Sequence, residues 1–144
     1  DIFNFADQVF SKGQSVRITV TGSSMQPFLR PLIDSVELEQ SSFSIIRKGD
    51  IVLFRRRSGT YVLHRLYRKS QDQCYFVGDA QTFVEGPIEP SQIIARVTSI
   101  WRSQKRIPAS NPALRLAVSV WTHTIFLRKV LNYLHRKLAA ARTN

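Results

Sequence analysis

Six short segments rich in β-branched and aromatic residues lie between residues 15 and 101, and they constrain the fold more than any other feature. They read SVRITVTG, DSVELEQ, GDIVLFRRR, TYVLHRLYRK, CYFVGD and IIARVTSIW, with Gly, Asp or Ser residues between them. Short runs of this composition, bounded by turn-forming residues, are typical of β-strands. The third and fourth are expected to form a hairpin that turns at Ser58-Gly59. The sequence therefore predicts a mostly β body.

Helical patterns flank this body on both sides. Residues 2–10 (IFNFADQVF) place apolar side chains at helical spacing, and Gly13 follows as a stop signal. Beyond the Pro-containing stretch RIPASNP, the sequence from residue 113 onward predicts a long amphipathic helix. Its apolar face holds Leu116, Val120, Leu127, Leu131, Leu134 and Leu138, while Arg128, Lys129, Arg136 and Lys137 lie largely off that face. We therefore expect a β domain over residues 1–106 and a basic helical tail over residues 107–144.

The composition limits the number of cores. The chain has 144 residues, of which 43% are hydrophobic, with nine Phe, four Tyr and two Trp. This is enough apolar material for one sizeable core, since domains most often contain roughly 100–150 residues. The single cysteine, Cys74, excludes an internal disulfide and a cysteine-rich metal site. One compact domain is expected.

The charge balance favours anionic partners. Lys and Arg total 21 and Asp and Glu total 10, which gives a formal net charge of +11. Nucleic acid and an acidic lipid surface both fit such a charge. The basic clusters FRRR, LYRK and WRSQKR stand next to aromatic residues on predicted strands, a pattern found in nucleic-acid-binding modules. A non-catalytic nucleic-acid-binding module is therefore one alternative function.

Three residues could form a hydrolytic site. A catalytic serine needs a neighbouring base and a third group that orients the base. Ser24 lies in VTGSSMQPFLRP, His64 in the predicted hairpin, and Asp79 in VGDA. His64 follows Ser24 by 40 residues and Asp79 follows His64 by 15, so only a folded sheet could bring them together. By residue type alone, a turn hydroxyl, a half-buried strand histidine and a turn-forming aspartate explain the same pattern.

A resemblance favours the hydrolytic site. The segments TGSSMQPFL, RKGDIVLFR, YVLHRLY and FVGDAQTFVEGPIEPSQIIARV resemble, in order and approximate spacing, the characteristic boxes of the signal peptidase I family over about residues 16 to 101. Four boxes in order are much more specific than any one. The Ser-Met box is also similar to that of the LexA-type self-cleaving repressors, which share the β fold but use a lysine where this chain has His64.

The resemblance implies a role for each candidate residue. The serine directly before the methionine is the nucleophile of that family, which corresponds to Ser24. His64 corresponds to the base position, as in the Ser-His branch of archaeal and endoplasmic-reticulum enzymes, and Asp79 would orient its imidazole. Glu85 stands where a second acidic residue, usually aspartate, follows in that branch. Gly22 stands where some members have a hydroxyl that helps to hold the oxyanion. Such chemistry needs neither a metal nor an organic cofactor.

The resemblance also implies the function: a serine endopeptidase that cleaves signal or leader peptides from preproteins. The predicted tail contains the apolar run Leu116 to Leu127, which is 12 residues long, whereas a helix needs ~20 apolar residues to cross a bilayer. We expect this helix either to lie on an anionic membrane surface or to pack on the β body or a partner subunit. The expected location is membrane-associated, with the cytoplasm as the alternative.

Overall fold

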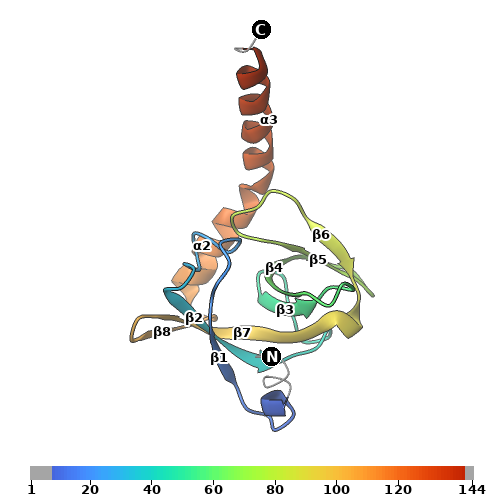
Figure 1. The fold of residues 1–144 in the computed structure, drawn as a ribbon, viewed down its shortest axis with the longest axis vertical. Helices are drawn as coiled ribbons and strands as arrows, with labels where there is room; N and C mark the ends of the chain where they lie inside the picture. The colour runs from blue at the N-terminus through green and yellow to red at the C-terminus, as the bar shows by residue number, and fades with distance from the viewer. Residues whose placement is uncertain (1–7, 142–144) are drawn as a thin grey trace.

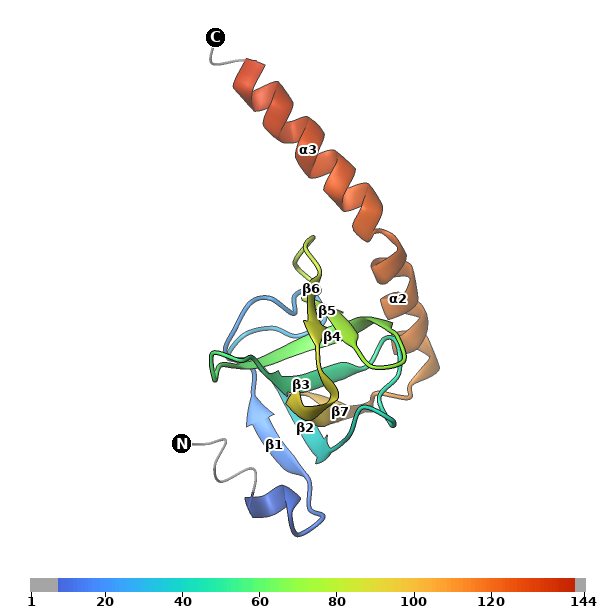
Figure 2. The same ribbon diagram turned by 90° about the vertical axis from the view of Figure 1, so that its right-hand side faces the viewer.

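The computed structural model describes residues 8–141, which form one antiparallel sheet of eight strands. Figures 1 and 2 show how the strands and helices are arranged. The strands are β1 (Val16–Thr19), β2 (Asp34–Gln40), β3 (Ile51–Arg55), β4 (Tyr61–Lys69), β5 (Cys74–Val77), β6 (Glu85–Ile88), β7 (Ile93–Arg102) and β8 (Lys105–Pro108), with a short 3-10 turn at Pro90–Gln92. Their order in the sheet is β1-β2-β7-β3-β4-β5-β6, and β8 pairs with β7. The predicted mostly β fold is confirmed.

The six predicted strands are all present, and the β3–β4 hairpin turns where expected, with Gly59 at a φ of 91°. Two strands were not predicted. β6 contains Gly86 and Pro87, residue types that are depleted in strands and tolerated mainly at sheet edges, which is where β6 lies. β8 occupies part of the expected hinge and is held by its pairing with β7. Both strands depend on their partners rather than on their own composition.

The N-terminal helix is described only at its end. Residues 8–10 are helical, whereas Ile2, Phe5 and Ala6 of the predicted apolar face lie outside the described residues. Phe10 is 2% exposed and belongs to the core. The chain then turns at Gly13, whose φ is 70°, a value that glycine adopts without strain.

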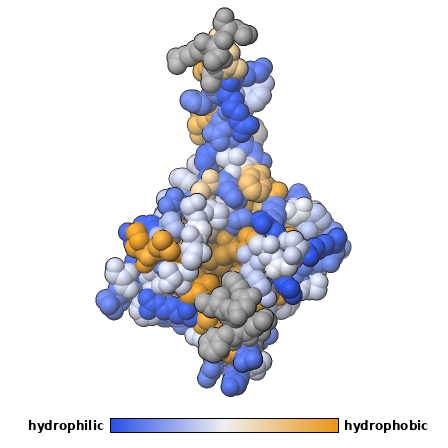
Figure 3. All heavy atoms as spheres, in the orientation of Figure 1, coloured by the Kyte–Doolittle hydropathy of each residue, from blue (hydrophilic) through white to orange (hydrophobic). Residues whose placement is uncertain are grey.

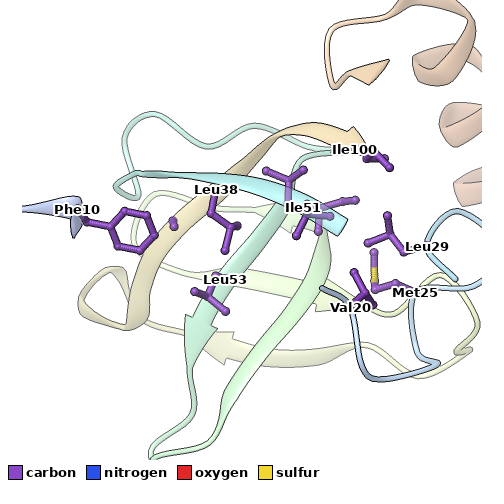
Figure 4. Packing of buried hydrophobic residues seen from close by; sticks show 11 residues of the cluster. Phe10, Val20, Met25, Leu29, Leu38, Ile51, Leu53 and Ile100 are labelled. Atoms are coloured by element: carbon purple, nitrogen blue, oxygen red, sulfur yellow. The ribbon is translucent and has the colours of Figure 1, made fainter. Parts of the chain in front are cut away.

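Two apolar clusters pack on opposite sides of the central strands. β3 is buried on both faces, because Ile51 and Leu53 point into one cluster while Val52 and Phe54 point into the other. Figure 4 shows the first cluster, in which Phe10 from the N-terminal helix lies at one end and Val20, Met25 and Leu29 at the other. Met25 is 2% exposed, so the residue after Ser24 is anchored in the core.

The C-terminal segment forms two helices, α2 (Pro112–His123) and α3 (Ile125–Ala141), rather than the single helix predicted. Asn111 caps α2 by accepting a hydrogen bond from the Leu114 N–H. α2 lies against the β body, while α3 projects away from it (Figures 1 and 2). Within residues 8–141, no helix combines the length and the apolar character needed to cross a membrane.

The apolar face predicted for the tail does not cover the β body. Its six members, Leu116, Val120, Leu127, Leu131, Leu134 and Leu138, are between 48% and 68% exposed. The side chains of α2 that turn inward are instead Leu114, Val118 and Trp121. Figure 3 shows that both apolar and hydrophilic side chains reach the surface of α3. Packing of the leucine face on the body is therefore the wrong alternative for the described residues.

Candidate active site

Ser24 and His64 come together at one end of the sheet. Ser24 lies in the turn between β1 and β2, and His64 lies in β4 opposite Val52 of β3. The Ser24 Oγ is 3.2 Å from the His64 Nε2, within reach of the hydrogen bond that a serine and its general base make. His64 is 4% exposed, and its ring meets the Phe54 ring edge-on at 6.3 Å between centroids. The packed strand thus fixes the imidazole beside the hydroxyl.

Glu85 lies on the other side of the imidazole. Its Oε2 is 3.5 Å from the His64 Nδ1, which is long for a hydrogen bond but close enough for a charge to act. Glu85 is the first residue of β6, and the pairing of β6 with β5 carries it to this position. Arg56 donates from its Nε to the Glu85 Oε1 and from its Nη2 to the Oε2, the latter at 2.9 Å. The order of contacts is Ser24, His64, Glu85, Arg56.

Asp79 is engaged elsewhere. Both of its carboxylate oxygens accept hydrogen bonds from Arg65, at 2.7 Å from Nε and 2.6 Å from Nη2, and the two side chains are almost completely buried. In the part of the chain that the structure describes, no hydrogen bond or ion pair joins Asp79 to His64. Neighbouring residues of a strand point to opposite faces, so Arg65 and His64 of β4 take different acidic partners. Glu85, rather than Asp79, lies within ion-pair distance of the His64 Nδ1, and that nitrogen makes no hydrogen bond within the described residues.

The Gly-Asp turn nevertheless touches the serine through its backbone. The Ala80 N–H donates to the Ser24 carbonyl at 2.9 Å. A Cβ at Gly78 would lie 2.7 Å from that same carbonyl oxygen, a distance that would force the backbone apart. Glycine at 78 therefore permits the close approach that holds the Ser24 turn against residues 78–80.

The electrostatics suit a histidine that acts as a base. Burial lowers the pKa of His64, the charge of Arg56 lowers it further, and Glu85 opposes both. The imidazole is thereby neutral near pH 7 and able to accept a proton. The hydrogen bond from Arg56 lowers the pKa of Glu85, which keeps that carboxylate ionised. Burial raises the pKa of Asp79, and the hydrogen bonds and charge of Arg65 oppose the rise.

Two hollows lie beside the helices. The larger, of about 500 Å³, lies beneath α2 and is lined by Ile51, Val97, Ile100, Leu114 and Val118 among others, with neither Ser24 nor His64 in its wall. The smaller, of about 420 Å³, separates the turn that follows Ser24 from α3, and its wall includes Gln26, Pro27 and Leu131. Among residues 8–141, His, Cys, Asp and Glu side chains form no group of three or more that could hold a metal ion.

Several residues at the site were not singled out from the sequence. Arg56 belongs to the run FRRR, which suggests a solvated basic strand end, and Arg65 directly precedes the basic cluster LYRK. The basic clusters are in fact partly consumed by internal contacts: Arg56 with Glu85, Arg57 with Glu89, Arg106 with Glu37, and Lys69 with the carbonyls of Phe43 and Ile46. The alternating direction of side chains along β4 is the sequence signal that could have indicated separate acidic partners for His64 and Arg65.

None of the protein-family models compared with the chain matches it, and no curated protein matches it either. Fold and site together define the class of protein: an antiparallel β protein with a buried histidine beside a half-buried turn serine.

Proposed function

We propose that this protein is a serine endopeptidase in which Ser24 is the nucleophile and His64 the general base. The observation that carries the proposal is the 3.2 Å approach of the Ser24 Oγ to the His64 Nε2. The neutral state expected of a histidine with a lowered pKa supports it. So does the intermediate exposure of Ser24, because a peptide carbonyl must be able to reach the hydroxyl.

The chemistry follows from these positions. His64 removes the hydroxyl proton as the Ser24 Oγ bonds to the scissile carbonyl carbon, and the carbonyl oxygen becomes an oxyanion. The imidazolium then donates that proton to the leaving amine as the C–N bond breaks, which leaves an acyl-serine ester. Water, deprotonated by His64, attacks the ester carbonyl. The bond to the Ser24 Oγ then breaks, the imidazolium returns the proton to that oxygen, and the acid is released. Glu85, ionised beside the Nδ1, stabilises the transient imidazolium.

A donor for the oxyanion is also at hand. Gly22 offers no hydroxyl, but the backbone N–H of Ser24 donates to no acceptor among the described residues. Backbone N–H groups close to the nucleophile are common oxyanion donors. We assign this role to the Ser24 N–H.

The substrate class follows from the resemblance to the signal peptidase I family. We propose signal or leader peptides with small side chains just before the cut. Ser24 is partly exposed and lies in a turn at one end of the sheet. An extended peptide that lies along exposed backbone can therefore reach its hydroxyl.

Peptide cleavage tests the catalytic pair. Purified protein would be incubated with a library of secretory and leader peptides, and products would be identified by mass spectrometry. Ser24→Ala and His64→Ala should each lower kcat/KM by about 10³-fold or more, because members of such a pair act as a unit. The matched controls are Ser44→Ala and His135→Ala, which change exposed residues away from the site. Equal cleavage by wild type and Ser24→Ala would falsify the proposal.

We also propose that α3 binds an anionic membrane surface. Leu127, Leu131, Leu134 and Leu138 form an exposed apolar face, and Lys129, Arg136 and Lys137 lie beside it. An amphipathic helix of this kind inserts its apolar face at the headgroup boundary and sets its cations against anionic lipids. This binding would hold the peptidase near membrane-inserted substrates.

Vesicle flotation tests the membrane role with a pair of matched variants. Leu131→Glu places a charge on the apolar face, whereas Asn132→Glu adds the same charge at the adjacent position off that face. Wild type and Asn132→Glu should float with phosphatidylserine-containing vesicles at low salt, and Leu131→Glu should float several-fold less. Failure of the wild type to float, or equal flotation of all three proteins, would rule out this role for α3.

A further inference from the structure

The C-terminal helices meet the candidate site at one backbone carbonyl, that of Asp79. The Trp121 Nε1 of α2 donates to this oxygen at 2.7 Å, and the Arg128 Nη1 of α3 donates to it at 2.8 Å. A carbonyl oxygen has two lone pairs, so these bonds use its full accepting capacity. Both donors come from the segment that the sequence assigns to a separate tail.

The two donors are themselves held in place. The Arg128 guanidinium lies 4.5 Å from the centroid of the Trp121 ring, a cation–π distance. The Phe28 ring meets the Trp121 ring edge-on, with 6.2 Å between centroids, and the Arg65 guanidinium lies 5.3 Å from the Phe28 centroid. Phe28 is four residues beyond Ser24. A continuous set of ring and cation contacts therefore joins the α2–α3 junction to the loop that contains the nucleophile.

The peptide group between Asp79 and Ala80 also makes a hydrogen bond to the residue that carries the nucleophile, Ser24. The Asp79 carbonyl and the Ala80 N–H belong to one peptide unit, which is planar and rigid. The helices bond to its oxygen, and its N–H donates to the Ser24 carbonyl at 2.9 Å. Because the unit cannot flex internally, a rotation of the Asp79 carbonyl would also move the donor that holds Ser24.

We propose that Trp121 and Arg128 are positioning residues that hold the 79–80 peptide unit, and through it Ser24, in line with His64; this inference rests on the proposed peptidase function. Neither side chain needs to touch the substrate for this role. A misplacement of about 1 Å can cost ~10²-fold in rate, so loosening this peptide should affect the chemical step more than substrate binding. The helical tail is then part of the catalytic unit rather than an appendage.

Two sets of variants test this role. Trp121→Phe removes the indole N–H and keeps an aromatic ring against Phe28. Arg128→Met removes the guanidinium, whereas Arg128→Lys keeps a donor that can reach the Asp79 carbonyl. Arg115→Met is the matched control, since Arg115 is an exposed arginine of α2. For each protein, kcat and KM would be measured on one cleaved peptide, together with the rate at which a fluorophosphonate probe labels Ser24.

We expect Trp121→Phe and Arg128→Met to lower kcat and the labelling rate about tenfold or more with KM changed less than about twofold. Arg128→Lys should recover most of the loss, and Arg115→Met should match wild type. Rates would be normalised to folded protein by circular dichroism, so that a variant that fails to fold leaves the other set to decide. If the folded variants cleave and label as fast as wild type, the inference is wrong. If Ser24→Ala also cleaves normally, the proposed function itself has failed.

Discussion

Two acidic side chains near the nucleophile each pair with an arginine, and the pairs differ in burial. Asp79 and Arg65 are 2% and 4% exposed, whereas Glu85 and Arg56 are 18% and 40% exposed at the side chain. Both oxygens of Asp79 are taken by Arg65, while the Glu85 Oε2 faces both Arg56 and His64. In the closed, buried pair of Asp79 and Arg65 the two charges compensate each other, whereas the open pair of Glu85 and Arg56 leaves a charge available to the histidine.

The largest expected effect is on stability at the buried pair. Asp79→Asn removes the charge that compensates Arg65, and breaking a buried ion pair in this way costs about 3–5 kcal/mol. Glu85→Gln should cost less than ~1 kcal/mol, because its partner is substantially exposed. Urea unfolding of both variants would measure the difference. If Asp79→Asn is as stable as Glu85→Gln, the two pairs do not differ in the way that their burial indicates.

A smaller effect is expected on catalysis at the open pair. Glu85→Gln removes the negative charge beside the Nδ1 of His64, so the imidazolium formed during reaction loses its stabilisation. We expect kcat/KM to fall about 10- to 100-fold, less than the ~10⁴-fold seen when a closely bonded triad carboxylate is neutralised, since the contact is 3.5 Å. Peptide cleavage at saturating and limiting substrate would measure this. Unchanged kinetics in Glu85→Gln would remove Glu85 from the mechanism.

The smallest effect is a shift in the pH dependence of kcat/KM. Replacing Glu85 and replacing Arg56, the two members of the open pair, should shift it in opposite directions. Since the pKa of His64 is lowered and the reaction needs the neutral imidazole, kcat/KM should fall as the pH decreases, with a midpoint below about 6.5. Glu85 raises this pKa and Arg56 lowers it. Glu85→Gln should therefore move the midpoint down and Arg56→Met should move it up, and both shifts should be small because these groups are partly exposed.

Profiles of kcat/KM measured from pH 4 to pH 8 would show these shifts, with Arg57→Met as the matched control. Arg57 neighbours Arg56 but pairs with Glu89 at the surface, and its loss should leave the midpoint in place. Shifts in the same direction for Glu85→Gln and Arg56→Met would contradict the electrostatic account of His64.

The sequence predicted the body of the fold because its strands carry their own signal. β1, β3, β5 and β7 are rich in β-branched and aromatic residues, and the structure contains each of them. β6 could not be predicted, because Gly86 and Pro87 disfavour a strand and only pairing with β5 at the edge creates it. The break between α2 and α3 was also missed, because the apolar residues before and after Thr124 keep the same helical spacing.

The acidic partner of His64 was the least predictable part of the site. Residue type and the family resemblance both indicated Asp79, the aspartate of the Gly-Asp turn, and neither assigned the histidine contact to Glu85. The choice depends on the pleat of β4, which turns His64 and Arg65 to opposite faces. It also depends on where β6 enters the sheet, because that places Glu85 at the Nδ1.

The sequence by itself determined the six short strands, the turn that contains Ser24, and the amphipathic character of the tail, because these depend on side chains close together in the chain. Tertiary structure alone decided which carboxylate faces His64, which side of α2 is buried, and that Trp121 and Arg128 reach the Asp79 carbonyl. The bonds from Trp121 and Arg128 to Asp79 join residues 42 and 49 positions apart, and no local pattern specifies the strand register and helix docking that create these contacts.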